Sequence, residues 1–344
     1  MIENHPAPTL VADLGGTNVR FAIAHTALEN PLIESSIRPY AVADFASMSA
    51  AARQYLSEIS AQPARAVFAV AGRVEGDEVR ITNLPWVISN AQIRGDLALS
   101  SLRIVNDFAG MSMSVPLLAA GDLQQIGNAV LIARPPDDTR TIGVIGPGTG
   151  LGVGAYLVRD GKPQVLETEG GHVAFAPGTP EEIEILQLLS KRFGRVSNER
   201  LICGSGLVNI YQALCVMANV AAQDFSPEQI TARAQQGTDA SCQRAIEIFC
   251  AVLGSIAGDL ALAIGAWDGI YLAGGIVPRL LPWLQQGGFR RRFEDKGRFA
   301  ATMQTVPTLA ITNAYAGLLG AAGIAKNDEA KRHGVAAIKD VAQV

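Results

Sequence analysis

Short apolar runs along the first third of the chain alternate with polar segments and predict strands separated by helices. The apolar residues of 47–59 recur at helical spacing, so this segment is expected to form a helix. Strands that alternate with helices indicate an α/β domain with a mixed sheet. The expected strands are Thr9–Asp13, Val19–His25, Ala66–Ala71, Val79–Thr82 and Leu102–Asn106.

A second series of strands is expected to begin near Ala129 and to run through Thr141–Val158. One further strand is predicted at Gly269–Ala273, and a final helix at Ala314–Ala325 has small residues on one face, which suits close packing. Between these, helices are expected at Pro180–Phe193, Gly206–Val220, Pro227–Gln235 and Ser241–Ile264.

This order of elements predicts two domains, in keeping with the length of 344 residues. The stretch Pro116–Gln125 is rich in turn-forming residues and is the expected border. The smaller domain is predicted to comprise residues 1–117, and the larger domain residues 118–313. Because chain termini often lie close together, the C-terminal helices of residues 314–344 are expected to complete the smaller domain.

Two glycine-rich turns stand between predicted strands. The first is Asp13-Leu14-Gly15-Gly16-Thr17-Asn18, and the second is Gly146-Pro147-Gly148-Thr149-Gly150. Glycine allows the positive φ angles of a primed hairpin turn, which leaves backbone N–H groups pointing outward. Clustered N–H donors bind anions, above all phosphate. Two such turns predict a duplicated fold that holds a polyphosphate from both sides.

A carboxylate follows the predicted strand at Leu102–Asn106. Asp107 stands at the carboxyl end of this strand, where a crevice is expected in an α/β sheet. There it would suit a general base within hydrogen-bond reach of one hydroxyl. An equally good interpretation of these residues alone is that Asp107 caps a helix that starts near Ala109.

Three further segments contain polar residues or glycines that could contact a ligand. Glu169 and His172 are separated by two glycines that would allow close approach to a ligand, although a turn with a satisfied histidine fits this spacing slightly better. Glu199 has the spacing of a helix-start or surface residue. Gly274 and Gly275 follow a predicted strand, where they would admit a phosphate or a flat ring, or else close helix packing.

The charge and composition exclude several classes of function. The net charge is −4, which disfavours nucleic acid as the main partner. The basic run Arg290-Arg291-Arg292 is interrupted by Glu294 and Asp295, which favours a solvated surface turn. No signal peptide is expected at the N-terminus. The apolar stretch Ala251–Ala266 contains Asp259 and is shorter than the ~20 residues that span a bilayer, so a buried helix is expected.

The cysteines do not form a metal motif. The four cysteines make no Cys-x-x-Cys pair, and His172 is the only histidine in the middle of the chain, so a zinc site has little support. Free thiols and the expected lack of a leader indicate the cytoplasm. The four positions are Cys203, Cys215, Cys242 and Cys250.

Taken together, these motifs closely resemble those of the bacterial glucokinase family. The resemblance covers nearly the whole chain and is to the branch that lacks a Cys-rich zinc motif. It implies a two-domain α/β fold of the actin-like ATPase type, a duplicated ribonuclease H-like fold with a cleft between the domains. In order, the motifs are Asp-x-Gly-Gly-Thr-Asn, Asn-Asp-Phe, Gly-x-Gly-Thr-Gly-Leu-Gly, Glu-Gly-Gly-His-Val, Ser-x-Glu-Arg and Ala-Gly-Gly-Ile-Val-Pro.

The resemblance also implies a role for each matching residue. Asp107 is similar to the catalytic base, which takes the proton from the sugar 6-hydroxyl. Asp13 is similar to the acid that holds Mg²⁺ through water. The sugar ligands are Asn106, Asp107, Glu169, His172 and Glu199. The contacts to ATP are Asp13, Gly15, Gly16, Thr17 and Asn18 in the first turn, Gly148, Thr149 and Gly150 in the second, and Gly274 and Gly275 at the adenosine.

The implied activity is ATP-dependent phosphorylation of D-glucose to glucose 6-phosphate, the entry to glycolysis, with ATP and Mg²⁺ as cofactors. Closure of the domains on sugar binding is expected to exclude water. The resemblance indicates a homodimer, while the charge, the cysteines and the apolar stretches indicate a cytoplasmic protein that binds neither nucleic acid nor a membrane. Two alternatives remain: a kinase for another hexose, and a sugar or nucleotide sensor without activity.

Overall fold

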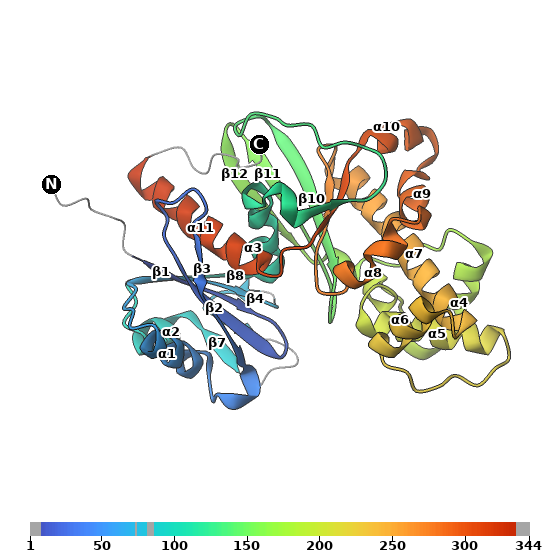
Figure 1. Cartoon of the computed structure of the whole chain (residues 1–344), viewed down its shortest axis with the longest axis horizontal. Helices are drawn as coiled ribbons and strands as arrows, with labels where there is room; N and C mark the ends of the chain where they lie inside the picture. Colours follow the sequence, from blue (N-terminus) through green and yellow to red (C-terminus); the bar gives the residue numbers. More distant parts are fainter. Residues whose placement is uncertain (1–7, 73, 81–85, 335–344) are drawn as a thin grey trace.

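Two mixed β-sheets with helices on their faces form the framework of the molecule (Figure 1). The computed structural model describes residues 8–72, 74–80 and 86–334. The first sheet has the order β3-β2-β1-β4-β8, and the second has the order β12-β11-β10-β13-β14-β9. The α/β class and the actin-like ATPase fold expected from the sequence are thus confirmed, the fold by the solved structures compared below.

The first sheet contains four of the five strands predicted for this part of the chain. Its antiparallel part is β1 (Thr9–Leu14), β2 (Asn18–Ala24) and β3 (Leu32–Ala41). Its parallel part joins β1 to β4 (Arg65–Val70) and β8 (Ser101–Asn106). Strand β3 was not predicted, because most of its side chains are partly or fully exposed and give no clear apolar alternation.

Each face of the first sheet is covered by a helix (Figure 1). One face packs on α1 (Met48–Glu58), which confirms the helix predicted at residues 47–59. The side chain of the N-cap residue Ser47 accepts a hydrogen bond from the Ala50 N–H. Beside it lie the small sheet β5 (Val74–Glu75), β6 (Glu78–Arg80) and β7 (Val87–Ser89), and helix α2 (Asn90–Asp96). Part of the strand predicted at Val79–Thr82 is β6, and its last two residues lie outside the described residues.

The second sheet has three parallel central strands. These are β10 (Arg140–Pro147), β13 (Ile270–Leu272) and β14 (Thr308–Ile311). The antiparallel strands β11 (Leu151–Arg159) and β12 (Lys162–Thr168) continue the sheet beyond β10, and β9 (Leu123–Gln125) pairs with β14.

The strand expected near Ala129 is not formed. Residues 126–139 contain no regular strand, and the second sheet begins earlier in the sequence, at β9. Val130 and Ile132 in this loop are 68% and 72% exposed. The apolar pattern was therefore misleading, because it does not correspond to burial in this segment.

The four helices predicted for the second half of the chain are confirmed with small shifts at their ends. They are α4 (Pro180–Phe193), α5 (Gly204–Met217), α6 (Pro227–Gln236) and α7 (Ala240–Ile264). Helix α7 is apolar and long enough to span a bilayer by length and composition, but 67% of its most apolar window is buried inside the protein, as in a core helix. The shorter helices that follow are α8 (Val277–Leu284), α9 (Gly288–Glu294) and α10 (Ala300–Thr305).

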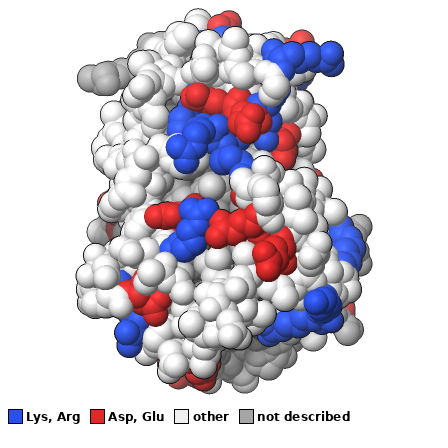
Figure 2. All heavy atoms as spheres, turned by 90° about the vertical axis from the view of Figure 1, so that its right-hand side faces the viewer, with Lys and Arg blue, Asp and Glu red and all other residues white. Residues whose placement is uncertain are grey.

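The basic run in α9 is not the solvated surface turn that the sequence indicated. Arg290 is only 7% exposed and donates hydrogen bonds to the carbonyl oxygens of Met303 and Val306. Arg292 donates two hydrogen bonds to the buried Glu182. These arginines satisfy buried acceptors. Figure 2 shows the side of the molecule on which α4 and α9 lie. Basic side chains on this side lie next to acidic ones.

Two helices connect the two sheets. Helix α3 (Asp107–Ser114) contacts β4 and β8 of the first sheet and β10, β11 and β12 of the second. It crosses α11 (Ala316–His333), where a Cβ atom at Gly320 would overlap the carbonyl oxygen of Gly110. Helix α11 also packs on β1, β2 and β4, and it continues beyond the predicted end at Ala325. A single apolar cluster therefore includes residues of both sheets.

Candidate active site

The first glycine-rich turn joins β1 to β2 through the four residues Gly15–Asn18, the last of which is also the first residue of β2. The pair Leu14 and Val19 closes the two strands, and the Gly15 N–H donates to the Asn18 carbonyl oxygen at 3.0 Å. A second hydrogen bond, from the Val42 N–H to the Thr17 carbonyl oxygen at 3.0 Å, fixes the loop from outside. The carboxylate of Asp13 precedes the loop on β1.

The second glycine-rich turn is a three-residue loop between β10 and β11. Its strands close at the pair Pro147 and Leu151, and the Gly148 N–H donates to the Gly150 carbonyl oxygen at 2.8 Å. The Gly148 carbonyl oxygen accepts a hydrogen bond from the N–H of Gly204, the first residue of α5, at 2.9 Å.

The primed hairpin geometry expected for these turns is wrong. Primed turns have two central residues, whereas these loops have four and three. Gly15, Gly16, Gly148 and Gly150 are not among the glycines with positive φ. At Gly16 and Gly148, a Cβ atom would meet no other atom within 4 Å. The missing side chains therefore leave open space beside the backbone, which a ligand can approach.

The turn at Gly274 lies directly against the second glycine-rich turn. Gly274 has a φ of 89°, and a Cβ atom there would lie 2.6 Å from the carbonyl oxygen of Pro147. Both the backbone conformation and the close approach require glycine at this position. Gly275, the next residue, has open space where a side chain would stand.

Helix α3 begins at the candidate base. Asn106 is the N-cap residue, and its Oδ1 atom accepts a hydrogen bond from the Phe108 N–H at 2.8 Å. Asp107 is the first residue of the helix, and its Oδ1 atom accepts from the same N–H at 2.9 Å. The alternative in which Asp107 caps the helix is therefore wrong, because Asn106 occupies that position.

The electrostatic environment of Asp107 raises its pKa to about 7. Burial has the largest effect, and the negative charges of Asp13 and Glu169 raise the pKa further. The Phe108 N–H acts in the opposite direction. Asp13 lies in the first sheet, and Glu169 directly follows β12 of the second sheet. The Asp107 carboxylate is therefore influenced by acids from two separate parts of the fold.

Asp13 is also strongly affected by its surroundings. Burial raises the pKa of this carboxyl, while the guanidinium of Arg20, whose Nη1 atom lies 3.5 Å from Oδ2 of Asp13, lowers it. A Cβ atom at Gly317, near the start of α11, would lie 2.9 Å from the Asp13 carboxyl carbon. The last helix of the chain thus packs against the carboxylate at the first turn.

The segment with Glu169 and His172 packs on the strand that follows the second glycine-rich turn. A Cβ atom at Gly171 would overlap the carbonyl oxygen of Leu151. The Nε2 atom of His172 lies 3.9 Å from Oε2 of Glu169, and both side chains are more than half exposed. The two side chains are therefore accessible from solvent, beside a rigid backbone contact.

Glu199 contacts the second glycine-rich turn itself. Its Oε2 atom accepts a hydrogen bond from the Leu151 N–H at 2.9 Å, and a Cβ atom at Gly150 would lie 2.5 Å from this oxygen. The structure gives this carboxylate a defined place beside the turn, although its local sequence is typical of a surface residue.

Comparison with known proteins assigns the chain to a family. A model of the family described as Glucokinase matches residues 10–328. The chain belongs to the glucokinase family. A curated glucokinase from Stenotrophomonas maltophilia (strain K279a) is 55% identical over 330 residues, which are 96% of this chain and 98% of that relative.

Two solved glucokinase structures share the fold. The crystal structure of a glucokinase from an Antarctic psychrotroph has a TM-score of 0.82 and 34% identity, and covers 92% of this chain and 98% of its own. A glucokinase from Balamuthia mandrillaris, in complex with glucose, has a TM-score of 0.79 and 22% identity, and covers 93% of this chain and 94% of its own.

This glucokinase-family site contains one residue that sequence reasoning missed. The ring of Phe108 occupies the space where side chains of Gly146 and Gly152 would stand, on both sides of the second glycine-rich turn. Phe108 thus connects the carboxylate of Asp107 to that turn. The signal available in the sequence was the string of glycines in β10 and β11, which indicates a bulky group packed against the strands.

The structure brings the predicted residues together in two sets. The turn Gly146–Gly150, Glu199 and Gly274 lie in direct contact, and the negative charges of Asp13 and Glu169 both act on Asp107. Among the hydrogen bonds of the described residues, none joins the loop Gly15–Asn18 to the loop Gly148–Gly150.

Proposed function

We propose that this chain transfers the γ-phosphoryl group of ATP to the 6-hydroxyl of D-glucose with Asp107 as the general base. Membership of the glucokinase family gives the reaction, since relatives that match nearly the full chain are glucokinases. The observation that supports the base is the buried Asp107 carboxylate. Burial and the negative charges of Asp13 and Glu169 raise its pKa to about 7. A base works best when its pKa lies near the operating pH.

The polar side chains around Asp107 are proposed to hold the sugar. Asn106, Glu169, His172 and Glu199 supply amide, carboxylate and imidazole groups, which can each bridge sugar hydroxyls. In this arrangement, Glu199 would use one oxygen to accept from the Leu151 N–H and the other to bind glucose. The sugar and the second glycine-rich turn would then be positioned by one side chain.

The glycine turns are proposed to hold ATP. Gly15, Gly16, Thr17 and Asn18 would contact the phosphates from one side and Gly148, Thr149 and Gly150 from the other, while Gly274 and Gly275 would contact adenosine. Since phosphoryl transfer has a loose transition state, the residues act mainly by positioning groups and neutralising charge. Alignment of this kind supplies on the order of 7–11 kcal/mol in ideal cases.

The residues beside the first turn fit Mg²⁺ as a cofactor. Among the described residues, no group of three or more Asp, Glu, His or Cys side chains could hold a metal ion alone. Mg²⁺ commonly takes one or two carboxylates together with substrate phosphates and water, and the Asp13 carboxylate beside the Gly15–Asn18 loop offers such a ligand. Bound there, Mg²⁺ would neutralise charge on the phosphates.

The division of the chain into moving parts is also a proposal. Residues 1–117 with 314–344 would form one domain and residues 118–313 the other, and glucose would bring them together. The support is that Asp13 and Glu169 both influence Asp107, although Asp13 lies in the first sheet and Glu169 directly follows β12 of the second. We also propose a cytoplasmic homodimer, with the four buried free cysteines in keeping with a reducing compartment.

Small-angle scattering tests both the closure and the assembly. The radius of gyration is expected to decrease when glucose is added, because closure excludes water from the site. The forward scattering is expected to give the mass of two chains. An unchanged radius would contradict closure, and a mass of 36.2 kDa, which is that of one chain, would contradict the dimer.

The pH dependence of activity tests the base. Asp107 must be ionised to accept a proton, so kcat/KM for glucose is expected to fall about tenfold for each pH unit below 7 and to be level above it. In Glu169→Gln, the loss of a nearby negative charge should lower the pKa of Asp107 and move the midpoint to lower pH. Glu167→Gln, two residues away on β12, is the matched control.

A coupled assay for glucose 6-phosphate with Mg-ATP provides these rates and decides between the alternatives. A midpoint that stays in place in Glu169→Gln would contradict the proposed charge coupling. Higher kcat/KM for mannose, fructose or an amino sugar than for glucose would make the chain a kinase for that hexose. Binding of ATP and glucose without turnover would indicate a sensor.

A further inference from the structure

A pocket lies at the end of the first sheet opposite the candidate active site. Asp13 and Asn106 stand near the carboxyl ends of the parallel strands β1 and β8, whereas this pocket is at the end where β1, β4 and β8 begin. The first residues of the three strands, Thr9, Arg65 and Ser101, are in register and line it. Its volume is about 180 Å³.

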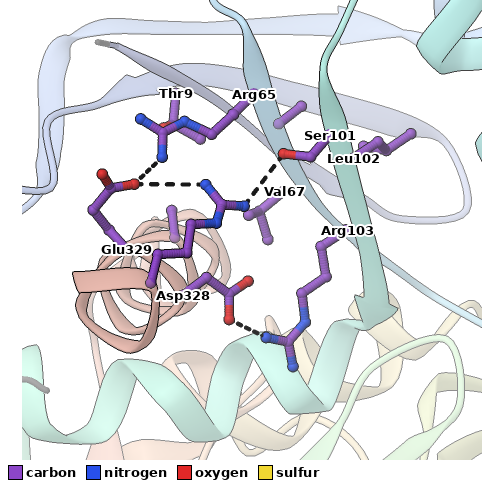
Figure 3. A pocket seen from close by; sticks show the side chains of 11 residues that line it. Thr9, Arg65, Val67, Ser101, Leu102, Arg103, Asp328 and Glu329 are labelled. Carbon is purple, nitrogen blue, oxygen red and sulfur yellow. Dashed lines mark hydrogen bonds and ion pairs between the residues drawn. The ribbon is translucent and has the colours of Figure 1, made fainter. Parts of the chain in front are cut away.

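The other wall of the pocket is one face of α11. Ala325, Asp328, Glu329 and Arg332 line it, at the spacing that places residues on one side of a helix. Figure 3 shows the side chains of Asp328 and Glu329 directed toward Arg103 and Arg65 of the strands. This part of the chain is helical and packs against the first sheet.

The charges around the pocket are not balanced one to one. Three guanidinium groups, from Arg65, Arg103 and Arg332, meet the two carboxylates of Asp328 and Glu329. Arg103 donates to Asp328 at 2.5 Å, so this pair is matched. Arg65 and Arg332 both pair with Glu329, the second at 3.7 Å. Two positive groups therefore share one negative group (Figure 3).

The two arginines that share Glu329 also affect each other. Burial and the positive charge of Arg332 both lower the pKa of the Arg65 guanidinium, and Arg65 is only 20% exposed. Such a pair is relieved by a second negative charge nearby. The hydroxyl of Ser101, which accepts from Arg332 at 3.4 Å, adds a polar group at the same place.

We propose that this arginine pocket binds a phosphate group, either as inorganic phosphate or as the phosphate of a small ester. Guanidinium forks match phosphate oxygens in geometry as well as in charge. The volume is below the ~300–1,000 Å³ of sites for larger organic ligands, which favours a compact ligand. If these side chains served only to clamp α11 against the sheet, two arginines would be enough to pair with the two carboxylates.

The site has a direct connection to the catalytic residues. Helix α11 has Glu329 and Arg332 at one end and Gly317, which packs on the Asp13 carboxyl group, near the other. An anion that pairs with Arg332 competes with Glu329 for it, and so acts on the helix that contacts Asp13. This connection gives the pocket a route to influence the reaction.

Isothermal titration calorimetry tests the proposal with the full chain at pH 8 and low salt. Glucose and a non-hydrolysable ATP analogue are kept saturating, so that phosphate does not enter the active site. Inorganic phosphate is expected to bind saturably to the unmodified protein. In Arg332→Gln, the loss of a charged hydrogen bond should weaken binding by about tenfold or more. Glucose 6-phosphate, titrated in parallel, shows whether an ester binds more tightly than the free ion.

Two further variants make the result specific. Arg53→Gln removes an exposed arginine that pairs with Asp96 outside the pocket, and it should bind phosphate as the unmodified protein does. Glu329→Gln removes the competing carboxylate, so it should bind phosphate more tightly, provided its circular dichroism shows a folded protein. Equal affinities in Arg332→Gln and Arg53→Gln, or no saturable binding to the unmodified protein, would show that the arginines are only a clamp.

Discussion

Replacing Asp107 with asparagine is expected to reduce kcat by about three orders of magnitude or more while glucose binds nearly normally. The amide keeps the shape of the side chain and can still form a hydrogen bond with the sugar hydroxyl, but it cannot accept the proton. The coupled assay gives kcat, and intrinsic fluorescence titration with glucose gives the affinity. Turnover within about tenfold of the unmodified protein would remove Asp107 from the role of base.

The same variant also has an expected effect on stability. This effect distinguishes the removal of an unfavourably buried carboxylate from a general disruption of the fold. The pKa of Asp107 is about 7 in the folded protein, against an ordinary value of 3.8. The folded state therefore holds a proton that the unfolded state has lost between these values, and stability decreases as pH rises through this window. The cost above pH 7 is at most about 4 kcal/mol.

Asp107→Asn removes this cost. Its melting temperature at pH 8 is expected to exceed that of the unmodified protein by several degrees. The difference should be clearly smaller at pH 5, where Asp107 is protonated in the folded protein and only the unfolded chain is ionised. Differential scanning calorimetry at both pH values provides the comparison. A variant that is less stable at pH 8 would show that the Asp107 carboxylate stabilises the fold and is not held there at a cost.

Replacing Gly320 with alanine is expected to destabilise the protein by about 1–3 kcal/mol or more. A Cβ atom at this position would overlap the carbonyl oxygen of Gly110, and it would also lie 3.1 Å from the Ser114 backbone nitrogen. Since both neighbours are backbone atoms of α3, the two helices must move apart. Helix α3 begins at Asp107, so kcat should decrease as well.

Gly95→Ala is the matched control for this substitution. Gly95 lies in helix α2, and a Cβ atom there meets no atom within 4 Å. Alanine has a higher helix propensity than glycine, so this variant should be as stable as the unmodified protein or up to about 1 kcal/mol more stable. Urea denaturation measures both variants. If Gly320→Ala were as stable as Gly95→Ala, the close crossing of α3 and α11 would be wrong.

The sequence by itself determined the order of most elements and predicted the chemistry of the site. Apolar runs predicted most strands of the first sheet and the four main helices, because these residues are buried at the period of their secondary structure. The glycine-rich turns and the carboxylate of Asp107 were recognisable because each is a local feature. Local patterns failed where burial did not follow them, as in the exposed loop with Val130 and Ile132.

Only the tertiary structure decided how these features meet. The contact of Glu199 with the Leu151 N–H joins residues 48 positions apart, and the crossing of α3 and α11 joins the first third of the chain to its last helix. The pKa of Asp107 depends on one acid in the first sheet and on another that follows β12 of the second. Burial and charge at a site are properties of the distances between segments, and a local sequence pattern contains no such distances. For the same reason, the burial of Arg290 and the pocket at Arg65 appeared only in the folded molecule.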